Sequence, residues 1–498
     1  MVNLRVVAWG IVLAVWATTT TQAAEHPNIV LILADDLGYG DVQALNPASR
    51  IPTPNLDRLA AEGATLTDAH SPSSVCTPTR YGILTGRYCW RTRLKSGVLN
   101  GYSPPLIEPG RRTIGDLLRQ AGYRTAAIGK WHLGMSLPML KDKTSPWQGD
   151  PGVDFDGLIA DAPIHRGFDY FFGVSASLDM APYVYIRNDR FVSRPTIQQP
   201  AVKFPHFVRQ GPRAEDFVID EALDRLVDEA VAFIDQATAE TSPYFLYLPL
   251  TAPHKPTQPH QRFRGTTGLG EYGDFVHQVD WSVGQVLRAI DRSEEADETL
   301  IIFTSDNGSY MYRYDDPHRV DHVEDASVQG FRQEHHRANG PWRGTKADIW
   351  EGGHRVPTFV RWPGKVESGS RIEAPVCTVD LFATLAEVVG QSVGEQEAED
   401  SFSWIPLLRG RRADRGAPVI HHSARGMFAI RDGRWKLVAG NGSGGRESPA
   451  GKPFEPPYSL FDLQSDPEEK TNVADRFPDK VAELVAQLEH IRTSGRSR

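Results

Sequence analysis

The strongest constraint on the fold of this chain is an unbroken, largely apolar run at residues 28–34 (NIVLILA). A run without alternation of polar and apolar positions predicts a strand that is buried on both faces of a sheet. Further strand-like runs follow at residues 123–128, 244–250, 300–304 and 356–360. Segments of helical character lie between them, at residues 54–62, 113–120, 223–234 and 276–290. Alternating strands and helices predict an α/β fold with a large, mainly parallel central sheet that is flanked by helices.

The composition changes toward the C-terminus. Residues 391–401 are polar and acidic, and residues 440–457 are rich in Gly, Pro and Ser. Two short apolar stretches, 427–430 and 435–438, flank the turn-like sequence Arg-Asp-Gly-Arg and predict a β-hairpin. Apolar residues at positions 481, 484, 488 and 491 predict a terminal helix. We therefore predict a main domain at residues 24–404 and a smaller α+β subdomain at residues 405–498.

The N-terminal segment has the pattern of an export signal. Arg5 is the only charged side chain before Glu25, and residues 6–17 form an apolar run of twelve. Such a run is too short to span a bilayer but fits the core of a signal peptide, here residues 1–23, with cleavage after Ala23 or Ala24. An N-terminal anchor is the alternative. We expect an exported protein, periplasmic or secreted, without stable membrane insertion.

Charge and cysteine content exclude some classes of protein. The net charge of -9 argues against general nucleic-acid binding, because that binding requires Lys and Arg to neutralise phosphates. The three cysteines, Cys76, Cys89 and Cys377, are too few for a disulfide scaffold or a four-cysteine zinc site. A disulfide between Cys89 and Cys377 stays open.

Polar residues follow four of the predicted strands directly. They are Asp35 and Asp36, then Lys130 and His132, then His254, and finally Asp306 and Asn307. Taken singly, each would be a turn, a helix cap or a surface residue. Ligand sites in open parallel sheets form outside the carboxyl ends of the strands, so we expect the four groups to converge in one crevice.

The converging residues favour one kind of metal. Asp35, Asp36, Asp306 and Asn307 offer only oxygen ligands, which suit calcium or magnesium rather than zinc or copper. The nearby Lys130, His132 and His254 would add positive charge and proton-transfer groups.

Cys76 begins the most specific local motif, Cys-Thr-Pro-Thr-Arg at residues 76–80. Thr77 suits a helix N-cap, Pro78 the first helical position and Gly86 the stop, so Cys76 would lie at the positive end of a short helix, within reach of Arg80. The alternatives are a buried apolar residue, a disulfide partner or a reactive thiol. A soft thiol beside hard carboxylates is chemically odd, which indicates that the sulfur does not survive in the mature protein.

The motif at residues 76–80, followed by Leu-Thr-Gly-Arg at 84–87, resembles the signature of the type I sulfatases. Segments 27–30, 53–57, 129–134, 165–169 and 344–346 support the resemblance by order and spacing. Thr79 departs from the family, which commonly has serine there. The resemblance implies an alkaline-phosphatase-like sulfatase fold with a catalytic domain at 24–404. It also implies that a formylglycine-generating or related maturation enzyme converts Cys76 to formylglycine.

The resemblance further implies a role for each matched residue. Asp35, Asp36, Asp306, Asn307 and the modified residue 76 would bind one calcium ion. Arg80 and Lys130 would hold the aldehyde hydrate and the sulfate, and His132 would act as the base on that hydrate. His254 and Lys346 would bind the ester and assist the leaving oxygen, and Ser177 would contact the substrate. The reaction would be hydrolysis of a sulfate monoester, in which one hydroxyl of the hydrate attacks sulfur and the other allows sulfate release.

The substrate is less defined by the sequence. Residues 309–341 insert a long segment rich in Arg and His between Asn307 and Lys346, and we expect it to face the substrate. Our interpretation is a sulfated carbohydrate, with small aryl sulfates as convenient substrates. Two alternatives are a phosphomonoester or phosphonate ester hydrolase on the same scaffold, and an inactive sulfated-glycan binding protein with an unmodified Cys76.

Overall fold

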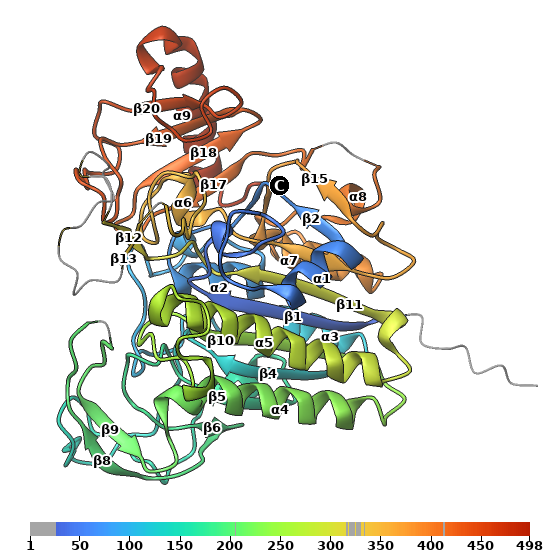
Figure 1. Ribbon diagram of the computed structural model, residues 1–498, viewed down its shortest axis with the longest axis vertical. Coiled ribbons are helices and arrows are strands. Elements are labelled where there is room, and N and C mark those ends of the chain that lie inside the picture. The colour runs from blue at the N-terminus through green and yellow to red at the C-terminus, as the bar shows by residue number, and fades with distance from the viewer. Residues whose placement is uncertain are drawn as a thin grey trace, which may run out of the picture.

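The computed structural model describes residues 26–498 except 205, 315–316, 318–323, 325–329, 333 and 412–413. The predicted signal peptide at 1–23 therefore lies outside the described residues. A ten-stranded sheet runs through the larger part of the molecule (Figure 1). Its strands are, in spatial order, β15 (Ser370–Ile372), β2 (Ala64–Leu66), β14 (Phe359–Arg361), β11 (Thr299–Ser305), β1 (Asn28–Asp35), β10 (Tyr244–Pro253), β4 (Arg124–Lys130), β5 (Tyr170–Val174), β6 (Ile186–Arg187) and β7 (Arg190–Phe191).

The centre of this sheet is parallel. Strand β1 pairs in parallel with β10 on one side and β11 on the other, and the parallel pairing continues through β4 to β5. Antiparallel pairs appear toward the edges, where β14 joins β11 and β6 joins β5. This arrangement confirms the predicted α/β fold. The strand predicted at 356–360 begins only at Phe359, because Pro357 has no N–H for the ladder.

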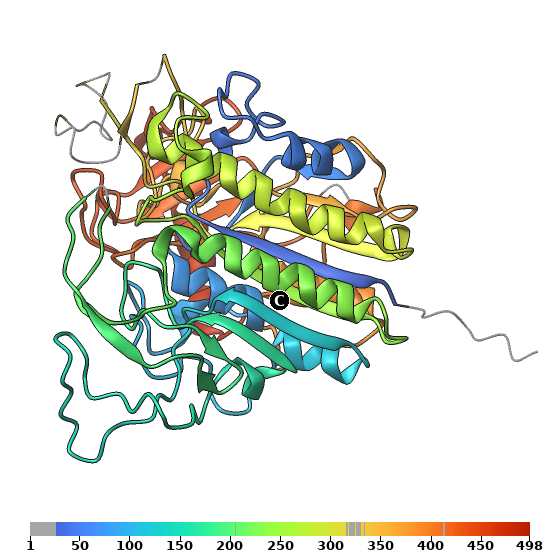
Figure 2. The ribbon, with the colours of Figure 1, turned by 60° about the horizontal axis from the view of Figure 1, so that its bottom comes forward.

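Helices cover both faces of the sheet because successive residues of β1 point to opposite sides. Val30 and Ile32 pack in one core with α1 (Pro54–Glu62), α4 (Ala222–Ala237) and α5 (Gly270–Arg292). Ile29 and Leu31 pack in a second core with α2 (Cys76–Thr85), α3 (Ile114–Gln120) and α7 (Leu381–Val388). Figure 2 shows α4 and α5 side by side along the strands.

Helix α2 starts earlier than predicted. It begins at Cys76 with Val75 as the N-cap, so Thr77 is not the cap. The reason is that the Thr77 hydroxyl is engaged elsewhere: it donates to the His132 carbonyl over 3.1 Å and accepts from Leu99 N over 3.2 Å. The predicted stop at Gly86 is confirmed, since its φ of 64° lies in the left-handed region that favours glycine.

The C-terminal part forms a separate antiparallel sheet at one end of the molecule (Figure 1). Its strands are β17 (Val419–His422), β18 (Phe428–Asp432), β19 (Trp435–Ala439) and β20 (Ser459–Asp462), and α9 (Pro478–Thr493) packs on it. The hairpin and the terminal helix are therefore confirmed. The short helix α8 (Ile405–Leu408) belongs to the core of the large sheet, and the boundary at 404/405 stays a prediction.

Other short elements lie outside the two larger sheets. They are α6 (Glu351–His354) and the two-stranded pairs β3 (Ala69–His70) with β16 (Val376–Cys377), β8 (Pro195–Gln199) with β9 (Gly211–Ala214), and β12 (Tyr312–Arg313) with β13 (Gly330–Phe331). Cys76, Cys89 and Cys377 are free thiols, all buried, so the disulfide left open by the sequence is not formed. No helix in the described part of the chain combines the length and apolarity needed to cross a bilayer.

Candidate active site

The carboxyl ends of the parallel strands bring the chemically active residues together. Asp35 ends β1, Lys130 ends β4, His254 follows β10 and Asp306 follows β11. The backbone is strained here: Asp36, His132 and Ala347 have φ values of 67°, 57° and 84°. Non-glycine residues with positive φ are uncommon and tend to gather at functional sites.

Three buried carboxylates and three buried cations form an ionic lattice beneath Cys76. The ammonium of Lys130 lies 2.6 Å from Asp35 Oδ2, and that of Lys346 lies 2.6 Å from Asp36 Oδ1. Arg80 donates through Nε and Nη2 to Asp306 Oδ2 over 3.0 and 2.7 Å. Each charge is therefore paired within the protein interior.

The thiol of Cys76 faces only hard polar groups. Its Sγ lies 3.3 Å from Lys346 Nζ and 3.6 Å from Asp35 Oδ1, and the residue is 2% exposed. Burial raises the pKa of the Cys76 thiol to about 12, despite the attraction of Lys130 and Lys346. The unmodified thiol is therefore protonated at neutral pH and is a poor nucleophile.

The oxygen-rich donor set fits a hard divalent cation. Asn307 Nδ2 donates to Asp36 Oδ1 over 2.7 Å, while Asn307 Oδ1 is buried without a hydrogen-bond partner among the described residues. Burial raises the pKa of Asp35 to about 7, outweighing the opposing effect of Lys130, so an additional positive charge beside this carboxylate would stabilise its ionised form. Asp35, Asp36, Cys76 and His254 also present potential ligand atoms within 4.8 Å of one another. A cation would supply that charge and a partner for Asn307 Oδ1.

The two histidines are held as neutral side chains. Burial, helped by Lys130 and Arg80, holds the pKa of His132 well below its usual value, and burial with Lys346 does the same for His254. His132 Nε2 lies 2.7 Å from the Leu99 carbonyl, which leaves Nδ1 buried and without a described partner. His254 Nδ1 lies 2.6 Å from the Lys255 carbonyl, and its Nε2 lies 3.7 Å from Asp36 Oδ2. Both rings thus keep one nitrogen as a proton acceptor.

A cavity of about 230 Å³ opens above this lattice. Cys76, His132, His254 and Lys346 line it, whereas Arg80, Lys130, Asp306 and Asn307 lie beneath it and are fully buried. The Ser177 hydroxyl, the weakest match in the sequence, also lines the cavity and has no described hydrogen-bond partner.

The cavity has further polar walls that sequence reasoning did not find. They are Asp179, Arg209, Lys255 and Arg446. Asp179 is fully buried and ion-paired with Arg209. Asp179 and Lys255 closely follow Ser177 and His254 in the sequence, and this proximity could have identified them as wall residues. Nothing in the Gly/Ser-rich surroundings of Arg446 marks it in the sequence.

The structure agrees only in part with the expectation that residues 309–341 face the substrate. Tyr310 lines the cavity. His336 does not, because it is buried against Asp41, with Nε2 2.6 Å from Oδ1. Arg332 and His335 line a different cavity, together with Tyr272 and Tyr314. Other members of the predicted set, at positions 318, 319 and 322, lie outside the described residues.

Comparison with known proteins gives the family. The profile of the Sulfatase family matches residues 27–391, and the chain belongs to this family. It is a type I sulfatase, a sulfuric ester hydrolase. An N-acetylgalactosamine-6-O-sulfatase of Bacteroides thetaiotaomicron is 32% identical to it, covering 95% of this chain and 94% of the relative. Arylsulfatase A of Bos taurus is also 32% identical, covering 96% and 91%.

Solved structures share the fold over nearly the whole length. One comes from work on the metabolism of multiple glycosaminoglycans by Bacteroides thetaiotaomicron and has a TM-score of 0.80 at 30% identity, covering 94% of this chain and 100% of that one. The crystal structure of Ps i-CgsB in complex with k-i-k-neocarrahexaose has a TM-score of 0.67 at 25% identity, covering 93% and 92%. The alkaline-phosphatase-like sulfatase fold is therefore confirmed.

Proposed function

We propose that this sulfatase hydrolyses a sulfate monoester of a carbohydrate in the cavity above Cys76, with one calcium ion and a formylglycine made from Cys76. The observation that carries the proposal is the setting of that thiol. It is buried at the start of α2, within 3.6 Å of Lys346 and Asp35 and beside a hard donor set. A thiol is a soft ligand and is poorly matched to such hard surroundings, whereas an oxygen-bearing side chain matches them.

Asp35, Asp36, Asp306 and Asn307 would hold the calcium ion. When bound, the ion supplies positive charge against the negative charge that develops on the sulfate oxygens. The unpartnered Asn307 Oδ1 and the raised pKa of Asp35 both favour a cation at this place. Arg80 keeps Asp306 ionised and oriented, because Arg80 and Lys130 outweigh the effect of burial and lower the pKa of that carboxyl.

The formylglycine supplies a hydrated aldehyde as nucleophile and a second hydroxyl for product release. The surrounding residues orient the substrate. Lys130 and Lys346 hold ammonium groups at Asp35 and at Asp36, close enough to residue 76 to act on its pKa, where they can bind sulfate oxygens. Lys346 Nζ, 3.3 Å from the residue 76 side chain and lining the cavity, can also donate a proton to the departing alcohol oxygen.

The two histidines have separate tasks in this proposal. His132 Nδ1, the ring nitrogen without a described partner, accepts a proton from residue 76 when sulfate leaves. His254 contacts the ester through Nε2, since its Nδ1 is occupied by the Lys255 carbonyl. Ser177 adds a hydroxyl contact from the cavity wall.

A carbohydrate fits the walls of the cavity better than an aryl group does. Asp179, Lys255 and Arg446 present carboxylate, ammonium and guanidinium groups beyond the sulfate-binding set. Such groups bind hydroxyls and reject a substrate that leaves them unpaired. The relatives named for N-acetylgalactosamine-6-sulfate and the complex with a carrageenan hexaose are consistent with this class.

Mass spectrometry of the peptide that contains Cys76 tests the proposal, on protein exported together with a maturation enzyme. We expect formylglycine at position 76, and sulfate release from N-acetylgalactosamine 6-sulfate that Cys76→Ala abolishes. An aryl sulfate and an aryl phosphate serve as comparison substrates. A fully active protein with an intact thiol would refute the nucleophile, and faster release of phosphate than of sulfate would favour the phosphoester alternative.

A further inference from the structure

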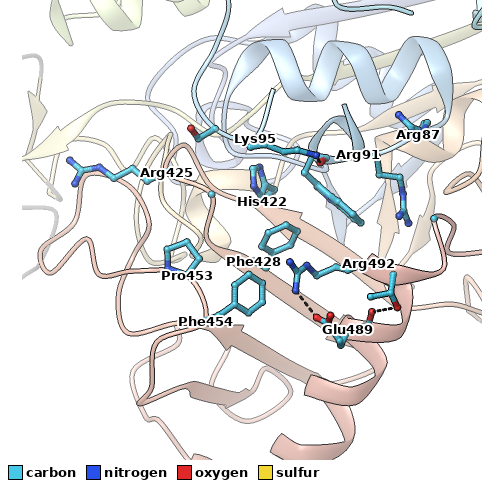
Figure 3. A pocket seen from close by; sticks show the side chains of 15 residues that line it. Arg87, Arg91, Lys95, His422, Arg425, Phe428, Pro453, Phe454, Glu489 and Arg492 are labelled. Carbon is cyan, nitrogen blue, oxygen red and sulfur yellow. Dashed lines mark hydrogen bonds and ion pairs between the residues drawn. The ribbon is translucent and has the colours of Figure 1, made fainter. Parts of the chain in front are cut away.

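Two cavities of the molecule differ in what their walls offer a ligand. The larger, of about 680 Å³, lies between the segment that follows α2 and the C-terminal sheet with α9 (Figure 3). Its cations do not converge, because Arg91 is paired with Asp400 and Figure 3 shows Lys95 and Arg425 pointing away from each other. The cavity above Cys76 is smaller, but buried polar atoms without partners lie in its walls. Such atoms, rather than volume, indicate where a ligand would supply hydrogen bonds.

The most informative of these atoms is the Oδ1 oxygen of Asp179, in the loop that follows β5. Asp179 lines the cavity and is buried, as are Cys76 and His132, which the proposed reaction requires. Its Oδ2 is ion-paired with Arg209, whereas Oδ1 has no hydrogen-bond partner among the described residues. A buried carboxylate oxygen that no donor reaches costs free energy, so a donor from a ligand would be stabilising at this point.

The Oδ1 oxygen of Asp179 faces the interior of the site. It lies 3.9 Å from Nδ1 of His254, a residue that also lines the cavity. That nitrogen lies 2.6 Å from the Lys255 carbonyl, which can only accept, so its proton is engaged there and does not serve Asp179. The other ring nitrogen, Nε2, lies toward Asp36 and is the one proposed to contact the ester. The imidazole ring thus separates Asp179 from the sulfate and leaves Oδ1 on the side of the sugar.

The loop that carries Asp179 is held in place by its own backbone. The Asp179 carbonyl accepts from the Arg209 N–H over 3.0 Å and from the Tyr183 hydroxyl over 3.1 Å. A turn closed by the Met180 N–H and the Ser177 carbonyl, over 2.9 Å, restrains the residues around it. Because the carboxylate is positioned before a substrate arrives, a contact with it requires little further ordering of the protein.

A carboxylate oxygen in this position favours a hydroxyl and disfavours an anion. It can accept a hydrogen bond but has none to donate, so the group that it binds must carry a proton. A sulfate at the same place would bring two negative charges together in a buried site, where their repulsion is greater than in water. The residue therefore distinguishes a free hydroxyl from a sulfated one.

We propose that Asp179 Oδ1 accepts a hydrogen bond from one free hydroxyl of the sugar that carries the reacting sulfate, and that it excludes a second sulfate from this hydroxyl. This inference rests on the proposed carbohydrate substrate. It adds a residue that determines specificity, and it limits the substrate to sugars that are unsulfated at one further position.

A cycle of enzyme and substrate changes tests the contact. The substrates are the methyl glycoside of N-acetylgalactosamine 6-sulfate and its 3-deoxy and 4-deoxy analogues, and the variant is Asp179→Ala. With the parent, we expect one deoxy analogue to lose roughly 10- to 100-fold in kcat/KM, as for one hydrogen bond to a charged acceptor. Asp179→Ala should lose as much on the complete sugar and nothing further on that analogue. Additive losses for both analogues would overturn the proposal.

An aryl sulfate separates this role from an effect on His254. Its kcat/KM should stay within about threefold in Asp179→Ala, because it has no sugar hydroxyl to offer, and this retained activity also shows that the variant is folded. An equal loss on the aryl sulfate and on the sugar would mean that Asp179 acts through the His254 ring, and would contradict the proposal.

A second sulfate tests the exclusion. The substrate is a disulfated sugar that carries its additional sulfate on the hydroxyl identified by the cycle. The parent should hydrolyse it at least about 100-fold less efficiently than the monosulfated sugar. Asp179→Asn removes the charge but keeps the size of the side chain, so it should recover at least about tenfold of this loss. No recovery in Asp179→Asn would refute the exclusion by charge.

Asp216→Ala is the matched control. Asp216 also has one oxygen paired with an arginine, Arg225 at 3.3 Å, and the other buried without a partner among the described residues, but it does not line the cavity. It should behave like the parent on every substrate, and a loss equal to that of Asp179→Ala would overturn the proposal. Failure of the proposed function would already appear in the parent, as hydrolysis of the aryl sulfate without release from any sugar.

Discussion

Two buried ionic clusters of this molecule have the same charge content and different surroundings. The cluster beneath Cys76 has three carboxylates and three cations: Asp35, Asp36 and Asp306 with Arg80, Lys130 and Lys346. The second cluster joins the large sheet to the C-terminal sheet and also has three of each: Asp68, Glu351 and Glu469 with Arg355, Arg431 and Lys436. Both also contain histidines that could ligate a metal, so composition does not tell them apart.

The second cluster is closed on itself. Lys436 Nζ lies 3.0 Å from Glu351 Oε1, 2.8 Å from Glu469 Oε1 and 3.1 Å from His354 Nε2, and Lys436 is fully buried. His70 links Asp68 to His354 through its two ring nitrogens, over 2.7 and 3.0 Å. None of these residues lines the cavity above Cys76. The groups bind one another and hold two parts of the chain together.

The pKa shifts of the carboxylates do not separate the clusters. Burial raises the pKa of Asp35 to about 7 in spite of Lys130, and it also raises the pKa of Glu469 in spite of Lys436. Burial acts on Asp306 and Glu351 too, but there the neighbouring cations outweigh it and lower the pKa of each carboxyl. The comparison teaches that buried charge alone does not mark an active site. The cavity does, because it opens onto the cluster beneath Cys76 and no residue of the closed cluster lines it.

The largest contrast is expected in kcat/KM when one carboxylate of each cluster is replaced by the corresponding amide. Asp306→Asn removes a charge of the proposed calcium site and the partner of Arg80, so kcat/KM for an aryl sulfate should fall by at least about 10³-fold. Glu351→Gln should leave kcat/KM within about threefold in the protein that remains folded, because Glu351 lies in the closed cluster. Steady-state kinetics at saturating calcium, with circular dichroism to confirm folding, measure both.

Calcium binding supplies the control for this pair. Excess calcium should raise the Tm of the parent and of Glu351→Gln, by an amount that depends on its concentration relative to Kd, and should have little effect on Asp306→Asn. If Asp306→Asn kept normal activity and a normal calcium response, the metal would have to be placed elsewhere.

The second contrast concerns stability, and here the larger effect is expected in the closed cluster. Lys436→Met leaves Glu351 and Glu469 buried without their shared cation, so the free energy of unfolding should fall by about 3–5 kcal/mol. Lys130→Met should cost less than half as much in the calcium-loaded protein, since the ion and Arg80, 3.7 Å from Asp35, still compensate that carboxylate. Denaturant titration in the presence of calcium measures both values. Equal losses would mean that the cluster beneath Cys76 is as structural as the closed one.

The central strands of the sheet and the charged residues beneath Cys76 could be predicted from the sequence. Unbroken apolar runs identified β1, β10 and β11, and the polar residues after them lie together because parallel strands end at the same edge of a sheet. The motif at 76–80 located the helix that carries Cys76, although the helix begins at that residue itself because Thr77 bonds to His132 and Leu99. Local pattern and strand order suffice for such features.

Features built from distant segments were not predictable in this way. The closed cluster joins His70 to Glu351, hundreds of residues further along the chain, and Glu351 to Lys436, 85 residues beyond it, and the three meet only through tertiary packing. The cavity walls at Asp179 and Arg446 arise in the same manner. Polar loop residues have no hydrophobic periodicity that could fix their position.

The smallest expected effect is a change in acid sensitivity at His421, in the closed cluster. Its ring is fully buried and stacks on that of His354, with centroids 3.7 Å apart, and it also faces His70, Lys436 and Glu351. Burial, with His70 and Lys436, holds the pKa of His421 well below its usual value, and Glu351 opposes this only in part. In the unfolded chain, the same histidine takes up a proton near pH 6.5.

Below that pH the unfolded state binds more protons than the folded state, so this histidine's contribution to stability is lost as the pH falls and is fully present above it. His421→Phe keeps a stacked ring but cannot be protonated. Its free energy of unfolding should therefore decline less steeply between pH 6.5 and 5 than that of the parent, by up to about 1.4 kcal/mol per pH unit. His490→Phe, at an exposed position on α9, is the matched control and should follow the parent curve. Parallel curves for His421→Phe and the parent would mean that His421 is not held neutral in the folded protein, so that the closed cluster accepts a proton there.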